Sequence, residues 1–347
     1  MSRLSPAPAD GPSQRELLID EMRRQNGDAL ATLDENRELA REIASRLRAR
    51  DRLLLLGMGA SHWSNRMAAG FYRAAGIDVR TEPISENLRQ PQASGGQVVF
   101  LTSQSGNSGE VRVWLGHHTD TRDVYGLTLQ EGSLLERSVP CLIGQGATEL
   151  PFAATRSISV TLALHGAVLE ALGVDLTSLR QLWSQPYQHP ELPEAAISAL
   201  THCRSLFLAS RAEAVPALEC CALTFMELAR TPAIALELGQ LIHGPQEALS
   251  NQTALLLVRR SGPDEANITR FAWQAMAWGV PLVMIDIGEG LVQIEGASTI
   301  SLPAANGLAA PAQLLPVLQA LIIDAAAHRL LDMGVPQRSS KVTDGEA

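Results

Sequence analysis

The sequence has few aromatic residues, few cysteines, an excess of negative over positive charge and no long uninterrupted apolar run. Phe, Trp and Tyr make up only 4% of the 347 residues, so Leu, Ala, Val and Ile must fill most of the core. The formal net charge of −9 argues against a nucleic-acid partner, because a phosphate backbone requires a basic surface. It does not exclude a small anionic ligand, which needs only a local site.

The cysteines and the N-terminal segment indicate the cellular compartment of the protein. The four cysteines lack the spacing of metal ligands, so we expect free thiols in a reducing compartment and no metal or cofactor: Cys141, Cys203, Cys220 and Cys221. The first residues, MSRLSPAPADGPSQ, lack the apolar centre of a signal peptide, and no eighteen consecutive residues are apolar. These features predict a cytoplasmic chain without membrane contact.

The first half of the chain alternates short apolar runs with helical patterns. Residues 1–14 are rich in Pro, Ser and Ala and predict a disordered leader, and residues 15–50 show helical periodicity among many charges. Apolar runs closed by small or polar residues follow, separated by helical stretches, which is typical of a parallel sheet covered on both faces. These runs are residues 52–61, 77–83, 98–103, 124–129 and 140–144.

The second half repeats this pattern. Strands are predicted within 205–211, 253–262, 281–288 and 298–303. The run at 52 and the run at 205 are about 153 residues apart, and VVFLTSQSG and ALLLVRRSG are about 156 apart. Two nearly equal offsets indicate a duplicated unit. We therefore predict an α/β protein of two tandem doubly wound, flavodoxin-like units, at 51–180 and 195–333, with a linker at 181–194 and a C-terminal tail at 334–347.

A polar loop, SQSGNSGEV, follows the apolar strand VVFLT directly. Ser103, Ser105 and Ser108 offer hydroxyl groups, and Gln104 offers an amide. Ligands of doubly wound sheets bind at the carboxyl ends of strands, where helix N-termini favour anions. The loop is therefore suited to a phosphate monoester, although Ser and Asn at this place could also serve only to cap the helix.

A second loop, GMGAS at 57–61, also combines glycine with a hydroxyl group after a strand. It is not the Gly-x-Gly-x-x-Gly of dinucleotide sites, because His62 stands where the third glycine would be. The carboxyl ends of neighbouring parallel strands meet at one edge of a sheet, so the two loops should converge. Their convergence favours phosphate binding over simple capping.

These two motifs resemble those of the sugar isomerase (SIS) domain family, whose paired copies form the isomerase half of glucosamine-6-phosphate synthase. The resemblance extends from about Glu21 to Val342 and implies two SIS domains. The loop 103–108 matches the family's phosphate loop, S-x-S-G-x-[ST]. The resemblance implies that five side chains bind the substrate phosphate: Ser61, Ser103, Gln104, Ser105 and Ser108.

The segment ELPFAATRSISVT (149–161) resembles the family's E-x-x-V-A-[AS]-T-K, which forms a wall of the sugar site. It differs at Phe152, where a smaller apolar residue is usual, and at Arg156, where the family has Lys. The resemblance implies a sugar pocket that includes Gly59, Phe152, Ala153 and Ser340.

The stretch 225–249 contains Glu227 and, sixteen residues later, His243 in a His-Gly-Pro sequence. Taken alone, these are most simply a solvated helix carboxylate and a histidine at a helix end. In related isomerases and deaminases, this spacing carries the catalytic base and the histidine that opens the sugar ring. The resemblance therefore implies these roles for Glu227 and His243. It also implies a homodimer with shared sites, because the family's histidine comes from a neighbouring subunit.

The tail VPQRSSKVT resembles the family's C-terminal P-R-x-L-[AS]-K-[SV]-V-T, and Lys341 matches its lysine. A lysine near the end of a chain is usually only solvated. The resemblance implies that its ammonium reaches the sugar carbonyl, where it could form an imine or stabilise an enolate. Gln337 and Ser339 replace the family's arginine and leucine in this segment.

Three positions near the proposed base also differ from the family. Thr224 and Met226 replace two lysines of the pattern A-L-K-L-K-E, which predicts a higher pKa for Glu227 or a pocket shaped for a different amine. Glu219 lies eight residues before Glu227, whereas seven is usual, so we assign it no leading role.

The predicted function is that of a phosphosugar isomerase or deaminase without a cofactor. Deamination of glucosamine 6-phosphate to fructose 6-phosphate and ammonia is favoured. A deglycase of 6-phosphofructosyl-amino acids is the alternative enzyme, since Thr224, Met226 and Phe152 alter the pocket wall. A non-catalytic sugar-phosphate sensor is a third possibility, although it predicts loss of Glu227 or His243, and the sequence has both.

Overall fold

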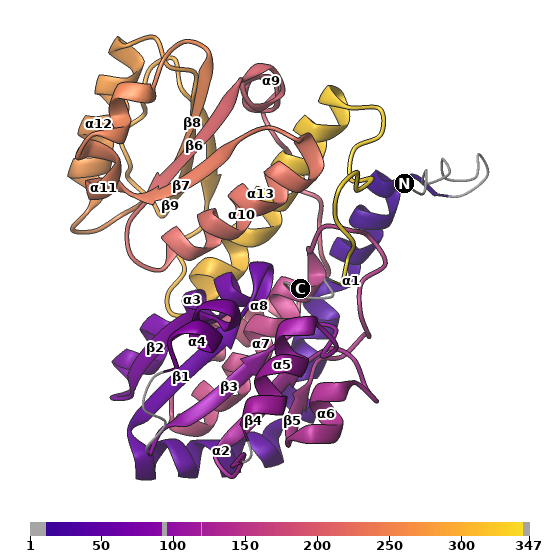
Figure 1. Cartoon of the computed structure of the whole chain (residues 1–347). Helices are drawn as coiled ribbons and strands as arrows, with labels where there is room; N and C mark the ends of the chain where they lie inside the picture. Colours follow the sequence, from indigo (N-terminus) through magenta and orange to yellow (C-terminus); the bar gives the residue numbers. More distant parts are fainter. Residues whose placement is uncertain (1–11, 92–95, 119, 343–347) are drawn as a thin grey trace.

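The structure, a computed structural model, describes residues 12–91, 96–118 and 120–342 and arranges them around two five-stranded sheets. Figure 1 shows the two halves one above the other, the first in purple and the second in orange. Residues 1–11 of the predicted leader and 343–347 of the predicted tail lie outside the described residues.

The two sheets have the same topology. The strand orders are β2-β1-β3-β4-β5 and β10-β9-β8-β6-β7, and all pairings are parallel. Both sheets thus have the flavodoxin-like order 2-1-3-4-5. The predicted α/β class with parallel sheets is confirmed. The strands are β1 (Arg52–Gly57), β2 (Asp78–Pro83), β3 (Val98–Thr102), β4 (Val124–Thr128), β5 (Cys141–Ile143), β6 (Ser205–Ser210), β7 (Ala233–Glu237), β8 (Thr253–Arg260), β9 (Leu282–Ile287) and β10 (Ser298–Leu302).

Helices cover both faces of each sheet. Those of the first half are α1 (Gln14–Glu35), α2 (Arg37–Arg50), α3 (Gly59–Ala74), α4 (Ile84–Arg89), α5 (Gly109–His117), α6 (Leu134–Ser138), α7 (Arg156–Leu172) and α8 (Thr177–Trp183). Those of the second half are α9 (Glu194–His202), α10 (Ala214–Ala229), α11 (Leu238–Ile242), the 3-10 helix η1 (Pro245–Ala248), α12 (Glu265–Ala277) and α13 (Ala309–Arg329). The stretch 184–193 between α8 and α9 has neither helix nor strand.

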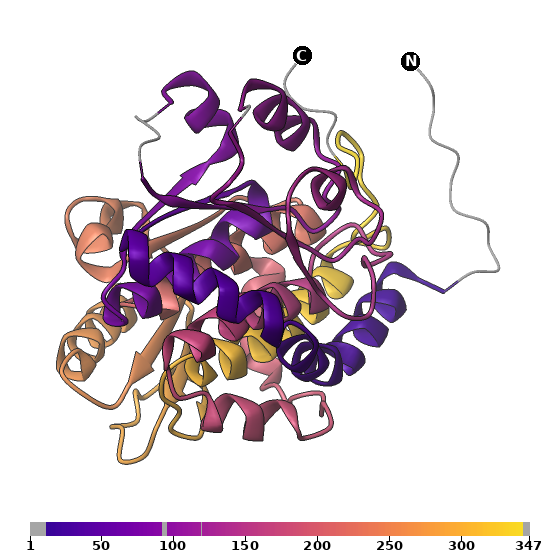
Figure 2. The ribbon, with the colours of Figure 1, turned by 90° about the horizontal axis from the view of Figure 1, so that it is seen from below.

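The N-terminal helical segment divides at Asn36. The Asn36 amide nitrogen donates to the Ile143 carbonyl oxygen at 2.9 Å, and the Ile143 N–H donates to the Asn36 side-chain oxygen at 2.9 Å. The Asn36 side chain therefore pairs with the backbone of the edge strand β5 as a neighbouring strand would. The chain turns from α1 into α2 at this residue. Figure 2 shows these helices, in indigo, lying across the first half of the molecule.

One hydrophobic core joins the two halves. It contains Leu53 and Phe100 from the first sheet and Leu208 and Leu256 from the second, together with apolar residues of α1, α2, α3, α7, α10 and α13. Helix α13 is apolar and long enough to cross a membrane by length and composition, but 94% of its apolar window is buried inside the protein. It is thus a central core helix, and its burial holds the halves in a defined arrangement.

Candidate active site

The loop after β3 is wound tightly by its own hydrogen bonds. The Gly106 N–H donates to both the carbonyl oxygen and the Oγ of Ser103, at 3.0 and 3.1 Å. Gly106 has a φ of +60°, and a Cβ at this position would lie 2.4 Å from the Oγ of Ser133. A glycine is required here because of both the backbone conformation and the close approach.

Several donors of this loop remain available to a ligand. Ser108 is the N-cap of α5, but its side chain makes no capping hydrogen bond. The buried amide nitrogen of Gln104 has no partner among the described residues. Ser61, 6% exposed, lies in the first turn of α3. The N-termini of two helices and three unused side-chain donors therefore meet at the carboxyl ends of β1 and β3, where they favour an anion.

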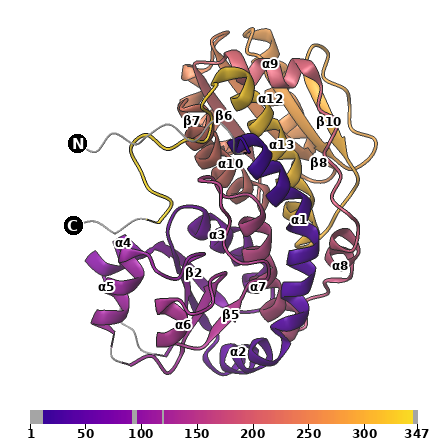
Figure 3. The ribbon, with the colours of Figure 1, turned by 90° about the vertical axis from the view of Figure 1, so that its right-hand side faces the viewer.

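These groups line a cavity of about 560 Å³ between the two halves of the chain. The first half supplies the loops after β1, β3 and β4 and the segment before α7, and the second half supplies α10 and the C-terminal tail. Figure 3 shows the tail, in yellow, descending from the second half toward the first. The predicted residues that line the cavity are Gly59, Ser61, Ser103, Gln104, Ser105, Ser108, Phe152, Glu227, Ser340 and Lys341.

Glu227 lies in the last turn of α10 and is half-buried in the cavity wall. Burial raises the pKa of its carboxyl group to about 7, the nearby Lys341 ammonium opposes this shift, and the Glu149 carboxylate adds to it. No hydrogen bond links Glu227 to another described residue. A carboxyl group with this pKa can both accept and release a proton near neutral pH.

Lys341 reaches the same cavity from the tail. Much of the residue is exposed, but its ammonium group donates a partly buried hydrogen bond to the Pro151 carbonyl oxygen. Burial lowers the pKa of this amine, whereas Glu149, Glu21 and Glu227 raise it. The amine is therefore deprotonated more easily than a free lysine, which suits it to react with or polarise a carbonyl group.

An ion pair that the sequence analysis did not identify anchors the tail. Arg230, which directly follows α10, donates to both carboxylate oxygens of Asp332 at 3.0 and 2.8 Å and to the Val335 carbonyl oxygen at 3.0 Å. Gln337 stands where the resembled motif has an arginine, and in this chain Arg230, just after α10, makes the charged contact with the segment before the tail.

Glu149 is a buried member of the site to which the sequence analysis gave no role. It is 4% exposed and lines the cavity. Its carboxylate accepts hydrogen bonds from the N–H and hydroxyl groups of Thr155, at 3.1 and 2.9 Å, and from those of Ser157, at 3.1 and 2.5 Å. These bonds close the loop before α7 and leave a fixed negative charge near Glu227 and Lys341.

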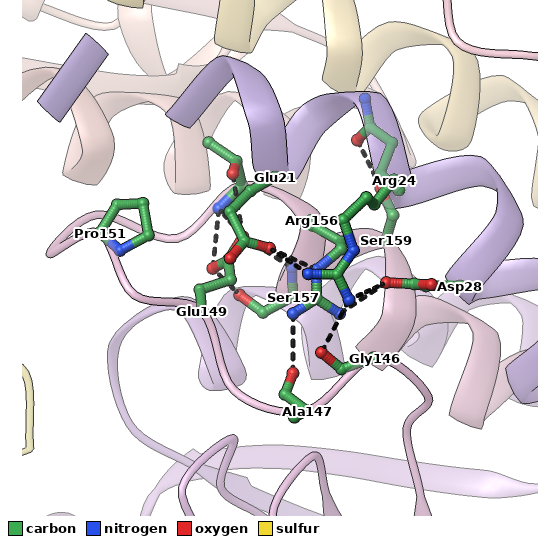
Figure 4. Close-up of polar contacts among 12 residues, drawn as sticks. Glu21, Arg24, Asp28, Gly146, Ala147, Glu149, Pro151, Arg156, Ser157 and Ser159 are labelled. Carbon is green, nitrogen blue, oxygen red and sulfur yellow. Dashed lines mark hydrogen bonds and ion pairs between the residues drawn. The ribbon is translucent and has the colours of Figure 1, made fainter. Parts of the chain in front are cut away.

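Arg156 fastens this loop to the N-terminal helix (Figure 4). The guanidinium group is fully buried and lies 2.6 Å from the Glu21 carboxylate and 3.1 Å from that of Asp28. It also donates to the carbonyl oxygens of Gln145 and Ala147, at 3.0 and 2.7 Å. The arginine that replaces the family's lysine thus satisfies four acceptors and sets the position of the cavity wall.

Two predicted site residues lie elsewhere. Ala153 is fully buried in the hydrophobic core, and its neighbour Ala154 lines the cavity instead. His243 follows α11 directly, is exposed and does not line the cavity of its own chain. The structure therefore brings Glu227 and Lys341 together with the serine loop but not with the histidine of the same chain.

The structure shows what surrounds Thr224, Met226 and Glu219, the three positions near Glu227 that differ from the family pattern. The Thr224 hydroxyl is buried and donates to the Cys220 carbonyl oxygen at 3.1 Å, and Met226 is 42% exposed. Neither brings a charge to the cavity. Glu219 instead pairs with Arg66 of α3 at 2.5 Å, so it links the two halves outside the cavity.

Several solved structures with the same fold are described as phosphosugar enzymes. The chain matches the C-terminal domain of glucosamine-fructose-6-phosphate aminotransferase from Francisella tularensis with a TM-score of 0.78 and 15% identity, over 90% of this chain and 96% of that one. It matches tagatose-6-phosphate ketose/aldose isomerase from Escherichia coli with a TM-score of 0.77 and 17% identity, over 93% and 95%. It matches glucosamine-6-phosphate deaminase from Thermotoga maritima with a TM-score of 0.74 and 19% identity, over 94% and 99%.

No protein-family model matches the sequence, and no curated protein sequence matches it. The chain thus shares the fold of phosphosugar isomerases across nearly its whole length, at identities that establish the fold alone.

Proposed function

We propose that this chain is an SIS-type phosphosugar isomerase that deaminates glucosamine 6-phosphate to fructose 6-phosphate and ammonia. The observation that carries the proposal is Glu227, a half-buried carboxyl group with a pKa of about 7 in a cavity that also contains the serine loop. The serines and Gln104 bind the phosphate and leave the carbon skeleton within reach of Glu227 and Lys341.

The proposed reaction consumes one water molecule. Ring opening yields a 2-amino aldehyde, and Glu227 removes the proton from C2 to give an enolamine. Return of a proton to C1 leaves an imine at C2, which water hydrolyses to the ketone and ammonia. The Lys341 ammonium stabilises negative charge that develops on the carbonyl oxygen.

The deglycase of 6-phosphofructosyl-amino acids remains a second candidate because of two observations. Phe152 adds an aromatic face to the cavity wall, and positions 224 and 226 bring no cation to it. An apolar wall of this kind suits an amine that carries an organic substituent.

An assay with both substrate classes tests the function. The protein is incubated with glucosamine 6-phosphate and with 6-phosphofructosyl-amino acids, and ammonia, free amino acid and fructose 6-phosphate are measured. We expect release of ammonia from glucosamine 6-phosphate, and a kcat/KM for unphosphorylated glucosamine lower by about 100-fold or more, because its phosphate-binding energy is lost. Turnover of neither class would contradict the enzyme proposal and favour the sensor.

We further propose that His243 of a second copy completes the site, since it does not line the cavity of its own chain. Chains carrying Glu227→Gln and His243→Ala should each be nearly inactive. When the two are co-expressed, random dimers would restore about a quarter of wild-type activity, because half are mixed and one of their two sites is intact. Activity no higher than that of the separate variants would contradict the shared site.

A further inference from the structure

A second cavity, of about 640 Å³, lies between α3 of the first half and the carboxyl ends of β6 and β7 in the second. It shares no lining residue with the first cavity. Charged side chains form much of its wall, two from α3 and two from the strand ends: Arg66, Arg73, Glu213 and Glu237.

The second cavity lies at the carboxyl ends of strands of the second sheet, as the first cavity lies at the carboxyl ends of strands of the first sheet. Helix α10 crosses to line the first cavity with Leu223 and Glu227, and helix α3 crosses to line the second with Gly70 and Ala74. These pairs are separated by 153 residues, the offset between the starts of β1 and β6. Because Ala74 occupies the place of Glu227, the second cavity has no base at the equivalent position and is suited to binding rather than turnover.

Guanidinium groups gather around the second cavity. Arg211 and Arg260 form ion pairs with its lining carboxylates, Glu237 and Glu213 respectively, and each arginine is 32% exposed. The Arg211 Nε is buried and lacks a partner among the described residues.

On α3, Arg66 pairs with Glu219, whereas the guanidinium group of exposed Arg73 has no hydrogen-bond or ion-pair partner in the described part of the chain. Two arginines and two glutamates line the cavity. With the ion-pair partners that lie outside the lining, Arg211, Arg260 and Glu219, the surroundings hold four guanidinium groups and three carboxylates, a local positive excess in a chain whose net charge is −9.

The end of β8 and the first residues after it take the place of the phosphate loop of the first half. Residues 259–262 read Arg-Arg-Ser-Gly, at the places where 103–106 read Ser-Gln-Ser-Gly. The Arg259 guanidinium donates to both carboxylate oxygens of Asp286, at 2.9 and 2.6 Å. Arg260 instead forms an ion pair with Glu213, which lines the second cavity. The second unit therefore has arginines where the first has Ser103 and Gln104, and one of them, Arg260, pairs with a carboxylate that lines the second cavity.

From this placement we propose that the second cavity binds a phosphate monoester, such as a sugar phosphate, without converting it. Guanidinium groups match the geometry of phosphate oxygens, and the dianion offsets the local positive excess. The bound ester contacts α3, whose first turn carries Ser61, next to α10, which carries Glu227.

Calorimetry with fructose 6-phosphate as the probe tests this site. In a chain whose first site is disabled by Ser103→Ala, Ser105→Ala and Ser108→Ala, we expect one remaining binding event per chain. Adding Gly70→Leu should weaken it by about tenfold or more, because a leucine side chain fills the cavity. A Cβ at Gly70 meets no atom within 4 Å, so the start of the new side chain has open space.

Gly70→Ala is the matched control: it makes the same change of helix propensity, leaves the cavity open and should retain the binding event. Inorganic phosphate in a parallel titration distinguishes a free-phosphate site from one that also recognises the sugar. Absence of binding in the triple serine variant, or equal binding in Gly70→Leu and Gly70→Ala, would overturn the proposal. If the triple variant does not fold, Gly70→Leu and Gly70→Ala are compared in the otherwise wild-type chain. The proposal then expects two binding events with Gly70→Ala and one with Gly70→Leu.

Discussion

Replacing Glu227 with Gln is expected to lower turnover of the phosphosugar by roughly 10²- to 10⁴-fold, the contribution of a positioned general base. The substitution keeps the shape of the side chain, and the serine loop is untouched, so binding of fructose 6-phosphate should remain within a few-fold of wild type. Steady-state kinetics and calorimetry measure the two effects separately. Glu194→Gln, at an exposed glutamate of α9, is the matched control and should leave both unchanged.

The wild-type rate should also depend on pH in a defined direction. Glu227 acts as a base only when ionised, and its pKa is about 7. The value of kcat/KM should therefore fall about tenfold per unit as the pH drops below 7. A profile that stays flat down to pH 5 would contradict the role of Glu227 as the base.

The substitution Glu227→Gln should also stabilise the folded protein at high pH. Burial raises the pKa of Glu227 from 4.5 to about 7, so the folded chain binds this proton more tightly than the unfolded chain does. Stability from this group is complete below pH 4.5 and is lost as the pH rises through 7. Glu227→Gln should therefore raise the free energy of unfolding by on the order of 1–3 kcal/mol at pH 8.5, and by little at pH 4.5. Urea unfolding at the two pH values measures the difference.

Arg156→Met is expected to destabilise the fold by roughly 3–5 kcal/mol, because it leaves the buried Glu21 carboxylate and two carbonyl oxygens without their cation. The loss should appear as a lower urea midpoint of unfolding, while the slope of the unfolding free energy against urea concentration stays unchanged. Arg122→Met is the control: its ion pair with Asp120 lies on the surface and is screened by solvent, so its loss should leave the urea midpoint nearly unchanged. Equal losses in the two variants would show that burial of Arg156 contributes nothing.

The strands of the two sheets were predictable where they are buried on both faces. A strand of this kind is a continuous apolar run, as in Val98–Thr102 and Leu282–Ile287, in which every residue is buried. Strand β7 (Ala233–Glu237) was not predicted. It is an edge strand whose residues are only partly buried or exposed, so its short sequence carries no strong period.

The lining of the first cavity was predictable where its residues are adjacent in the sequence. The hydroxyl loop at 103–108 and the position of Glu227 follow from short motifs. The bond of Arg156 to Glu21, by contrast, spans 135 residues, and that of Arg230 to Asp332 spans 102, so local patterns could not indicate either. Ala153 and Ala154 are both small and apolar, and only the path of the loop decides that Ala154 faces the cavity.

The contact between Arg230 and Val335 shortens the free tether that carries Lys341. Lys341 lies twelve positions after Arg329, where α13 ends, but only six positions after Val335. Halving a flexible segment lowers its closure entropy cost by about 0.6 kcal/mol, which corresponds to a nearly threefold higher local concentration of the amine at the cavity. Under the proposed function, Arg230, which lies outside the cavity, thereby raises the fraction of time for which the Lys341 amine lies beside the substrate.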